Sequence, residues 1–353
     1  MSETDTIIFD TASRIFDDLS TPEVINAAEE GEWPKALWQA IEESGLNLTW
    51  VPEANGGIGA SLLDGFAVIK AAGAAALPVP LAETLMAGWL LSKAGLEVSS
   101  EPATVGLGEV QYVNGVLNGT INAVPGGRSA KQLVVVCKDG NDWLVAQMAT
   151  DQCQIAAHNS LAGEPFDSIT LSDVIPVQSG VLTGGMDADS VQAMGALIRC
   201  VQAAGALSAA LELTIEYSME RVQFGRPIGK FQSLQHSVAA FAGEVAAINA
   251  AADAAAEALA RADGVVDHEA WVEIATAKTR LEEAVNTGAA VAHQVHGAMG
   301  FTYEHRLHHL TRRLWSWRDE YGNDTVWAKR LGEEVLSWGA DELWPKITAV
   351  SNA

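Results

Sequence analysis

The sequence predicts a mostly helical α+β protein in three parts: an N-terminal helical domain (residues 1–100), a shortened antiparallel β domain (101–185) and a C-terminal four-helix bundle (186–353). Three features favour this division. Apolar positions at helical spacing, interrupted by glycine-containing turns, occupy the first part. Valine-rich runs spaced roughly ten residues apart follow. An alanine-rich region with long apolar stripes then continues to the end.

Two helices are expected in the N-terminal part. WPKALWQAIEESG places Leu37, Trp38 and Ile41 at helical spacing, and Gly45 is a stop signal. SLLDGFAVIKAAGAAA gives a second helix, which follows the turn PEANGGIG. These segments predict helices joined by turns rather than a sheet.

Short strands are expected in the middle part. The runs are LVVVC at 133–137, WLVAQM at 143–148 and SITL at 168–171, with turn residues DGND and PGG around them. This region is short for a complete sandwich or barrel, so it predicts a small antiparallel sheet.

Long helices are expected in the C-terminal part. One apolar stripe runs from Leu234 to Leu259 at alternating spacings of four and three, and a second runs from Trp271 to Val295. Together with the apolar segment 190–220 and the tryptophan-rich tail, they predict four helices in a bundle.

The composition limits the partners. The chain has 45 acidic against 21 basic residues and a net charge of -24, which disfavours nucleic acid and anionic membrane surfaces. Cys137, Cys153 and Cys200 lie far apart without a CxxC pair, as in reduced cytosolic proteins. The start, MSETDTIIFDTASRIF, lacks the basic beginning and apolar run of a signal peptide, and no uninterrupted apolar stretch has membrane-spanning length. The sequence therefore predicts a soluble cytoplasmic protein.

A basic cluster interrupts this acidic chain at RVQFGRPIGKF. It contains Arg221, Arg226 and Lys230, between the end of one predicted helix and a new one near Gln232. A P-loop is excluded, because Phe231 stands where a magnesium-ligating Ser or Thr is needed. Either the cations and free helix amides hold an anion, or the segment is a solvated turn.

A glycine pair follows in QVHGAMGF, at the end of another predicted helix. Gly297 and Gly300 let backbone or ligand approach closely, and Gln294 offers a donor and an acceptor. The alternative is a helix cap followed by a turn.

The histidines of EHRLHHLTRR have helical spacing. His305, His308 and His309 suggest a metal, but none of the eight histidines has a Glu three positions before it, as di-iron bundles require. We therefore expect an amphipathic helix and no metal site.

Candidate catalytic residues are few. No GxSxG elbow is present, and no Cys has a convincing His partner. Asp319 and Glu320, in RDEYGND, are candidates for a general base if they are buried, and otherwise are cap or surface charges.

In order along the chain, these stretches resemble the acyl-CoA dehydrogenase family, and the resemblance covers most of the chain. The stretches are LWQAIEESGLNLTWVPEANGGIGASLLD, ERVQFGRPIGKFQSLQH and QVHGAMGFTYEHRLHHLTRR. The resemblance implies an FAD enzyme acting on CoA thioesters. It also implies contacts to the FAD pyrophosphate and adenosine from Arg221, Phe224, Gln232, Gln294, Gly297 and Gly300. In the family these groups act across a dimer interface, on the neighbour's flavin.

The sequence lacks the family's motifs that contact the flavin ring bound by the same chain. Residues 101–180 lack the TEPxxGSD-like loop and the W-x-(S/T) strand. At the family's usual YEG base, Tyr321 stands before Gly322, with Glu320 one position early, and the alternative base position holds Gly195. One residue rotates a helical side chain by roughly 100°, so Glu320 is poorly placed for this role.

The chain thus keeps the residues that contact the neighbour's flavin and lacks those that hold a flavin ring of its own. In this it resembles the shorter subunit of heteromeric (α2β2) acyl-CoA dehydrogenases for steroid side chains, and we expect it to be active only as part of a complex. The expected partners are a longer subunit carrying the glutamate, an acyl-CoA substrate and an acceptor such as electron-transfer flavoprotein. Two alternatives stay open: a self-sufficient homo-oligomer that uses Glu320, and a structural subunit without cofactor contact.

Overall fold

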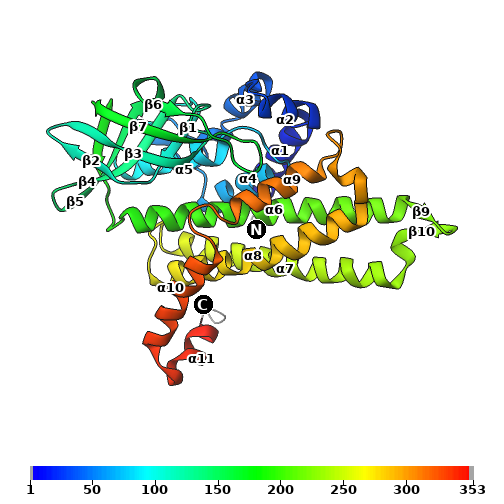
Figure 1. Ribbon diagram of the computed structural model, residues 1–353. Helices are drawn as coiled ribbons and strands as arrows, with labels where there is room; N and C mark the ends of the chain where they lie inside the picture. Colours follow the sequence, from blue (N-terminus) through cyan, green and yellow to red (C-terminus); the bar gives the residue numbers. More distant parts are fainter. Residues whose placement is uncertain (1–2, 350–353) are drawn as a thin grey trace.

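The computed structural model describes residues 3–349, and its first part is helical (Figure 1). The helices are α1 (Glu3–Leu19), α2 (Pro22–Glu29), α3 (Lys35–Glu43), α4 (Leu62–Ala74) and α5 (Leu81–Lys93). The two helices expected from sequence are α3 and α4. Ser61 and Asp64 form a capping box at the start of α4, which satisfies backbone donors that the helix itself leaves free.

The middle part is one eight-stranded sheet with the order β6-β7-β3-β2-β4-β5-β8, and β1 pairs with β4. Its strands are β1 (Ala103–Gly106), β2 (Val110–Val113), β3 (Val116–Pro125), β4 (Gln132–Asp139), β5 (Asp142–Ala149), β6 (Gln154–Ala156), β7 (Phe166–Val174) and β8 (Gln178–Val181). Most strand pairs are antiparallel, as expected, but two pairings with β4 are not. β1 runs parallel to β4 over four residue pairs, and β2 also meets β4 in parallel.

The three valine-rich runs lie in β4, β5 and β7, whereas β3 is a strand that the sequence did not reveal. β3 contains NGTINAVP, and its pairing with β7 has two register shifts. Such irregularities break the period of two on which strand prediction depends.

The last part is built around α6 (Ala188–Glu220), which runs the length of the molecule (Figure 1). The others are α7 (Gln232–Arg261), α8 (His268–His296), α9 (Leu307–Trp317), α10 (Asp324–Trp338) and α11 (Ala340–Ala349). α6, α7 and α8 pack on one another, α9 packs on α6 and α8, and α10 packs on α8. The tryptophan-rich tail thus contributes shorter helices instead of a single long one.

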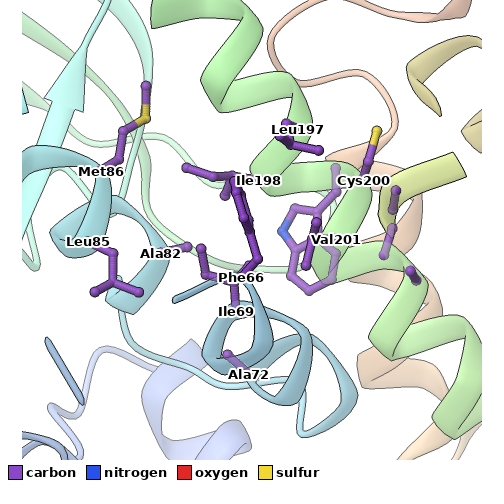
Figure 2. Packing of buried hydrophobic residues seen from close by; sticks show 14 of the residues in the cluster. Phe66, Ile69, Ala72, Ala82, Leu85, Met86, Leu197, Ile198, Cys200 and Val201 are labelled. Carbon is purple, nitrogen blue, oxygen red and sulfur yellow. The ribbon is translucent and has the colours of Figure 1, made fainter. Parts of the chain in front are cut away.

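The N-terminal helices and the bundle share one core. Figure 2 shows Phe66 and Ile69 of α4 beside Ile198 and Val201 of α6, and Ala82 and Leu85 of α5 belong to the same buried cluster. α4 and α6 approach so closely that a Cβ on Gly205 would collide with the backbone carbonyl of Lys70. This packing fixes α5 against α6, which matters below because each carries one partner of a buried ion pair.

Two helices, α6 and α7, are long and apolar enough to cross a membrane by length and composition alone, although charged residues such as Arg199 and Glu244 interrupt them. In α6, 83% of the apolar window is buried within the protein, as in a core helix; in α7 the share is 28%. Length and composition alone therefore do not distinguish a core helix from a membrane span.

Candidate functional site

The basic cluster forms a hairpin at the far end of α6. α6 ends at Glu220, β9 (Val222–Gln223) and β10 (Arg226–Pro227) pair antiparallel, and α7 begins at Gln232. Phe224 and Gly225 make the turn with φ of +52° and +79°, a left-handed backbone that costs a phenylalanine roughly 1–2 kcal/mol. The Phe224 side chain is 92% exposed. The fold holds an apolar ring in solvent on a strained turn, as functional positions often do.

The three cations of this hairpin differ from other arginines of the bundle in their surroundings. Arg261, Arg280 and Arg318 elsewhere in the bundle pair with carboxylates. Within residues 3–349, by contrast, no ion pair joins Arg221, Arg226 or Lys230 to a carboxylate. The guanidinium of Arg226 instead lies 4.2 Å from the ring centroid of Phe231. Unneutralised positive charge is therefore concentrated on an exposed, projecting element.

The glycine pair follows α8. Gln294 lies exposed in the last turn, and Gly297 caps the helix with φ 59° and ψ -138°, a conformation open essentially to glycine alone. Gly300 is buried, and a Cβ there would lie 2.9 Å from a methyl carbon of Leu307. Gly297 thus satisfies a backbone requirement, whereas Gly300 satisfies a packing requirement inside the protein.

The hairpin and the glycine segment meet at the same end of the bundle. The ring of Tyr217, one turn before Arg221, stacks on the ring of His296 with centroids 4.6 Å apart. All six residues expected to contact FAD therefore belong to two adjoining segments, joined by this stack. Gln232 is exposed at the first position of α7.

A cavity of about 710 Å³ lies at the opposite end of α6, beneath the β-sheet. Gln192 of α6 lines it, and Glu320 and Tyr321 contribute from the segment after α9. Between Gln192 and Arg221 lie about 44 Å of helix at 1.5 Å per residue. Figure 1 shows the sheet and the β9–β10 hairpin at opposite ends of α6.

Glu320 is buried in an ion-pair network. Arg199 of α6 donates from Nε to Glu320 Oε2 at 2.7 Å and from Nη2 to Glu83 Oε1 of α5 at 2.5 Å. Ser316 donates to the other Glu320 oxygen at 3.2 Å. Burial by itself would lower the pKa of Arg199, but the charges of Glu320 and Glu83 outweigh burial and raise it. Both oxygens of Glu320 are already engaged within the protein.

The position of Gly195, the alternative base site, is filled by Tyr321. A Cβ on Gly195 would collide with the Tyr321 ring, and that ring lies 5.7 Å from the Arg199 guanidinium. Tyr321 has a φ of +56°. Asp319, the other candidate carboxylate, lies half exposed beside Arg318 at 3.6 Å.

The histidines of α9 are packing residues. His308 and His309 are buried with ring centroids 3.8 Å apart, and burial lowers the pKa of His308 to about 4. Nδ1 of His309 lies 3.4 Å from Glu29. Among the residues that the structure describes, no three His, Cys, Asp or Glu side chains are arranged to hold a metal ion.

The sequence did not reveal Arg199 and Glu83. A signal was present: Arg199 lies inside the apolar stretch VQAMGALIRCVQAAGALSAA, where a charge must find a buried partner. The partners, however, lie 116 and 121 residues away, so only the fold identifies them.

Comparison with known proteins agrees with this architecture. Residues 188–336 match the model of the acyl-CoA dehydrogenase C-terminal domain, and residues 2–100 match that of the N-terminal domain. The chain is 29% identical to acyl-CoA dehydrogenase IpdE2 of Mycolicibacterium smegmatis over 345 residues, covering 95% of this chain and 100% of that protein.

Two solved structures share the fold. The ChsE4-ChsE5 complex of Mycobacterium tuberculosis matches with a TM-score of 0.86 and 23% identity, covering 96% of this chain and 99% of that chain. The Tcur3481-Tcur3483 steroid ACAD, a G363A variant, matches with a TM-score of 0.84 and 24% identity, covering 95% and 98%. With both terminal domains matched in sequence and the whole fold matched in structure, the chain belongs to the acyl-CoA dehydrogenase family.

Proposed function

We propose that this chain is a subunit of an FAD-dependent acyl-CoA dehydrogenase and binds the diphosphate and adenosine part of a flavin whose ring lies in a longer partner subunit. The observation that carries this proposal is the separation of the two candidate sites along α6. The unpaired cations lie at one end, and the cavity with Glu320 lies at the other.

The residues of the hairpin end fit a dinucleotide tail. Arg221, Arg226 and Lys230 offer cations that form no ion pair within residues 3–349, which suits an anionic diphosphate. Phe224 presents an exposed ring for stacking, and Gln294 an exposed amide that both donates and accepts. Gly297 leaves its backbone open to close approach. Family members typically bind FAD.

None of the candidate residues at the cavity end is suited to act as the catalytic base. α,β-Desaturation of a CoA thioester needs a free carboxylate to take the proton from the α-carbon, while bound FAD accepts the hydride from the β-carbon. Glu320 is held by Arg199 and Ser316, and no side chain can extend from Gly195 past Tyr321. The base is therefore expected from the partner.

The similar proteins support the proposed partner and substrate class. ChsE4-ChsE5 and Tcur3481-Tcur3483 are two-component complexes, and the second is a steroid ACAD. On that basis we expect a heterotetramer in the cytoplasm that oxidises the side chain of a steroid CoA ester. Electron-transfer flavoprotein or a similar acceptor is expected to reoxidise the flavin.

The domain limits at residues 100 and 185 stay a prediction.

The test is to purify the chain alone and together with a longer homologue encoded beside its gene. We expect a colourless, inactive protein alone and a yellow, active complex with FAD bound at the shared interface. Yellow and active protein from this chain alone would overturn the proposal and favour the self-sufficient enzyme using Glu320. If substitutions of the hairpin residues leave the flavin content of the complex unchanged, the purely structural subunit would be favoured.

A further inference from the structure

We propose that the cavity between the sheet and α6 is a binding site for an apolar small molecule whose polar end donates a hydrogen bond, an alcohol or an amine. This inference does not depend on the proposed flavin contacts, which lie at the other end of α6. The cavity volume, about 710 Å³, falls within the range of small-ligand sites, roughly 300–1,000 Å³.

The body of the cavity is apolar. Val105 and Val136 of the sheet form a fully buried part of its wall, and Leu107 adds a half-buried side chain. Aromatic rings from three different parts of the chain complete it: Trp143, Phe166 and Trp315. A compact hydrocarbon would remove the exposed parts of Leu107 and of the three rings from water, at about 25 cal/mol per Å² of apolar area.

The charged groups of the cavity are all acceptors. Asp189, Asp319 and Glu320 line it, and the lining residues that the structure describes include no lysine or arginine. An ionised carboxylate accepts hydrogen bonds and donates none, so the polar end of a ligand beside these groups must be a donor.

An anion has no counter-charge in this cavity. The arginines nearest to these carboxylates are already paired: Arg330 with Asp189, Arg318 with Asp319, and Arg199 with Glu320. The first turn of α6, which would otherwise attract an anion, carries Asp187 as its cap and Asp189 beside it. A diphosphate or a carboxylate would meet three carboxylates and neutral donors such as Asn122 and Gln192 but no cation, which argues against flavin and CoA phosphates in this cavity.

Three probes that share the adamantane hydrocarbon and differ in their polar group test this inference: 1-adamantanol, protonated 1-adamantylamine and adamantane-1-carboxylate. Each is titrated calorimetrically into the chain in its purified state, with its partner if the two copurify. We expect the alcohol and the amine to bind, and the carboxylate to bind at least tenfold more weakly. Equal binding of all three, or tightest binding by the carboxylate, would overturn the proposal, as would binding by none.

A charge reversal locates the binding. In Asp319→Lys, whose side chain is half exposed and whose replacement should leave the fold intact, we expect the amine to lose at least tenfold in affinity. The carboxylate should gain, and the alcohol should change little. Asp341→Lys, at the exposed start of α11, is the matched control and should change none of the three. If both variants behave alike, the probes bind elsewhere and the assignment of this cavity is wrong.

Discussion

Glu320 and Arg199 are joined by a buried hydrogen bond of 2.7 Å between Glu320 Oε2 and Arg199 Nε. The same guanidinium binds Glu83 on α5, so one arginine on the central helix connects the N-terminal helices with the segment after α9. A carboxylate with this partner is a structural anion. Protonating it during catalysis would remove one of the two carboxylates that compensate the buried charge of Arg199.

Glu320→Gln should therefore lower stability and spare activity. Replacing a charged hydrogen-bond partner of Arg199 is expected to reduce the free energy of unfolding by about 1.5–3 kcal/mol, measured by urea denaturation. The turnover of the intact complex should stay within a few-fold of wild type. Glu333→Gln, an exposed carboxylate paired with Lys329, is the control and should change neither. A loss of activity of about 100-fold or more would identify Glu320 as the base instead.

Gly195→Ala should be destabilising because the Tyr321 ring occupies the space of the new methyl group. Overpacking of this kind costs about 1–3 kcal/mol in the free energy of unfolding. In the Tyr321→Gly background, the same Gly195→Ala substitution should cost much less, since the ring that causes the clash is gone. An equal cost in both backgrounds would show that Tyr321 does not fill this position.

Phe224→Gly should separate binding from stability. Glycine adopts a φ of +52° without the penalty of a side chain, so the free energy of unfolding should rise by up to about 1 kcal/mol. Loss of the exposed ring should at the same time weaken flavin retention by the complex. Asn114→Gly, another positive-φ position in a turn of the sheet, should leave flavin retention unchanged. Undiminished retention in Phe224→Gly would exclude a role for the ring.

Lys278 should give the protein a distinctive dependence on alkaline pH. Burial lowers its pKa from 10.5 to about 8, although its Nζ donates to the carbonyls of Trp317 and Arg318 at 2.9 Å. Between these pH values the unfolded chain binds the extra proton, so stability rises with pH. The stability of wild type relative to Lys278→Met should increase by about 2 kcal/mol between pH 8 and pH 10. A pH-independent difference would place the pKa of Lys278 near its ordinary value.

Local sequence patterns were sufficient for α3, α4, α6, α7 and α8, but not for α1, α2, α5 and the short helices of the tail. Gly45 and Pro227 stand where backbone geometry interrupts a helix, and the apolar stripes of α7 and α8 mark the faces that pack on α6. β3 escaped prediction because its register shifts break the alternation of the strand. The parallel pairing of β1 with β4 joins segments that no short-range signal connects.

For the candidate sites, too, the sequence revealed local clusters but not contacts between distant segments. The cations of the hairpin are adjacent in sequence and could be recognised as a cluster, but that they lack acidic partners is evident only in the fold. The environment of Glu320 depends on Arg199 and Glu83, which come from distant helices, so its suitability as a base was not decidable from sequence spacing.

The flavin content of the complex carrying Arg221→Ala tests the central claim most directly. Arg221 makes no ion pair with a carboxylate in the described part of the chain, so its loss should not disturb folding. A charged contact to a diphosphate contributes about 1.5–3 kcal/mol, which corresponds to roughly 10- to 150-fold in FAD affinity. Arg261→Ala, at the other end of α7, removes the same charge and serves as the control. We predict that only Arg221→Ala yields a complex depleted of FAD, and equal flavin content in the two variants would contradict the account.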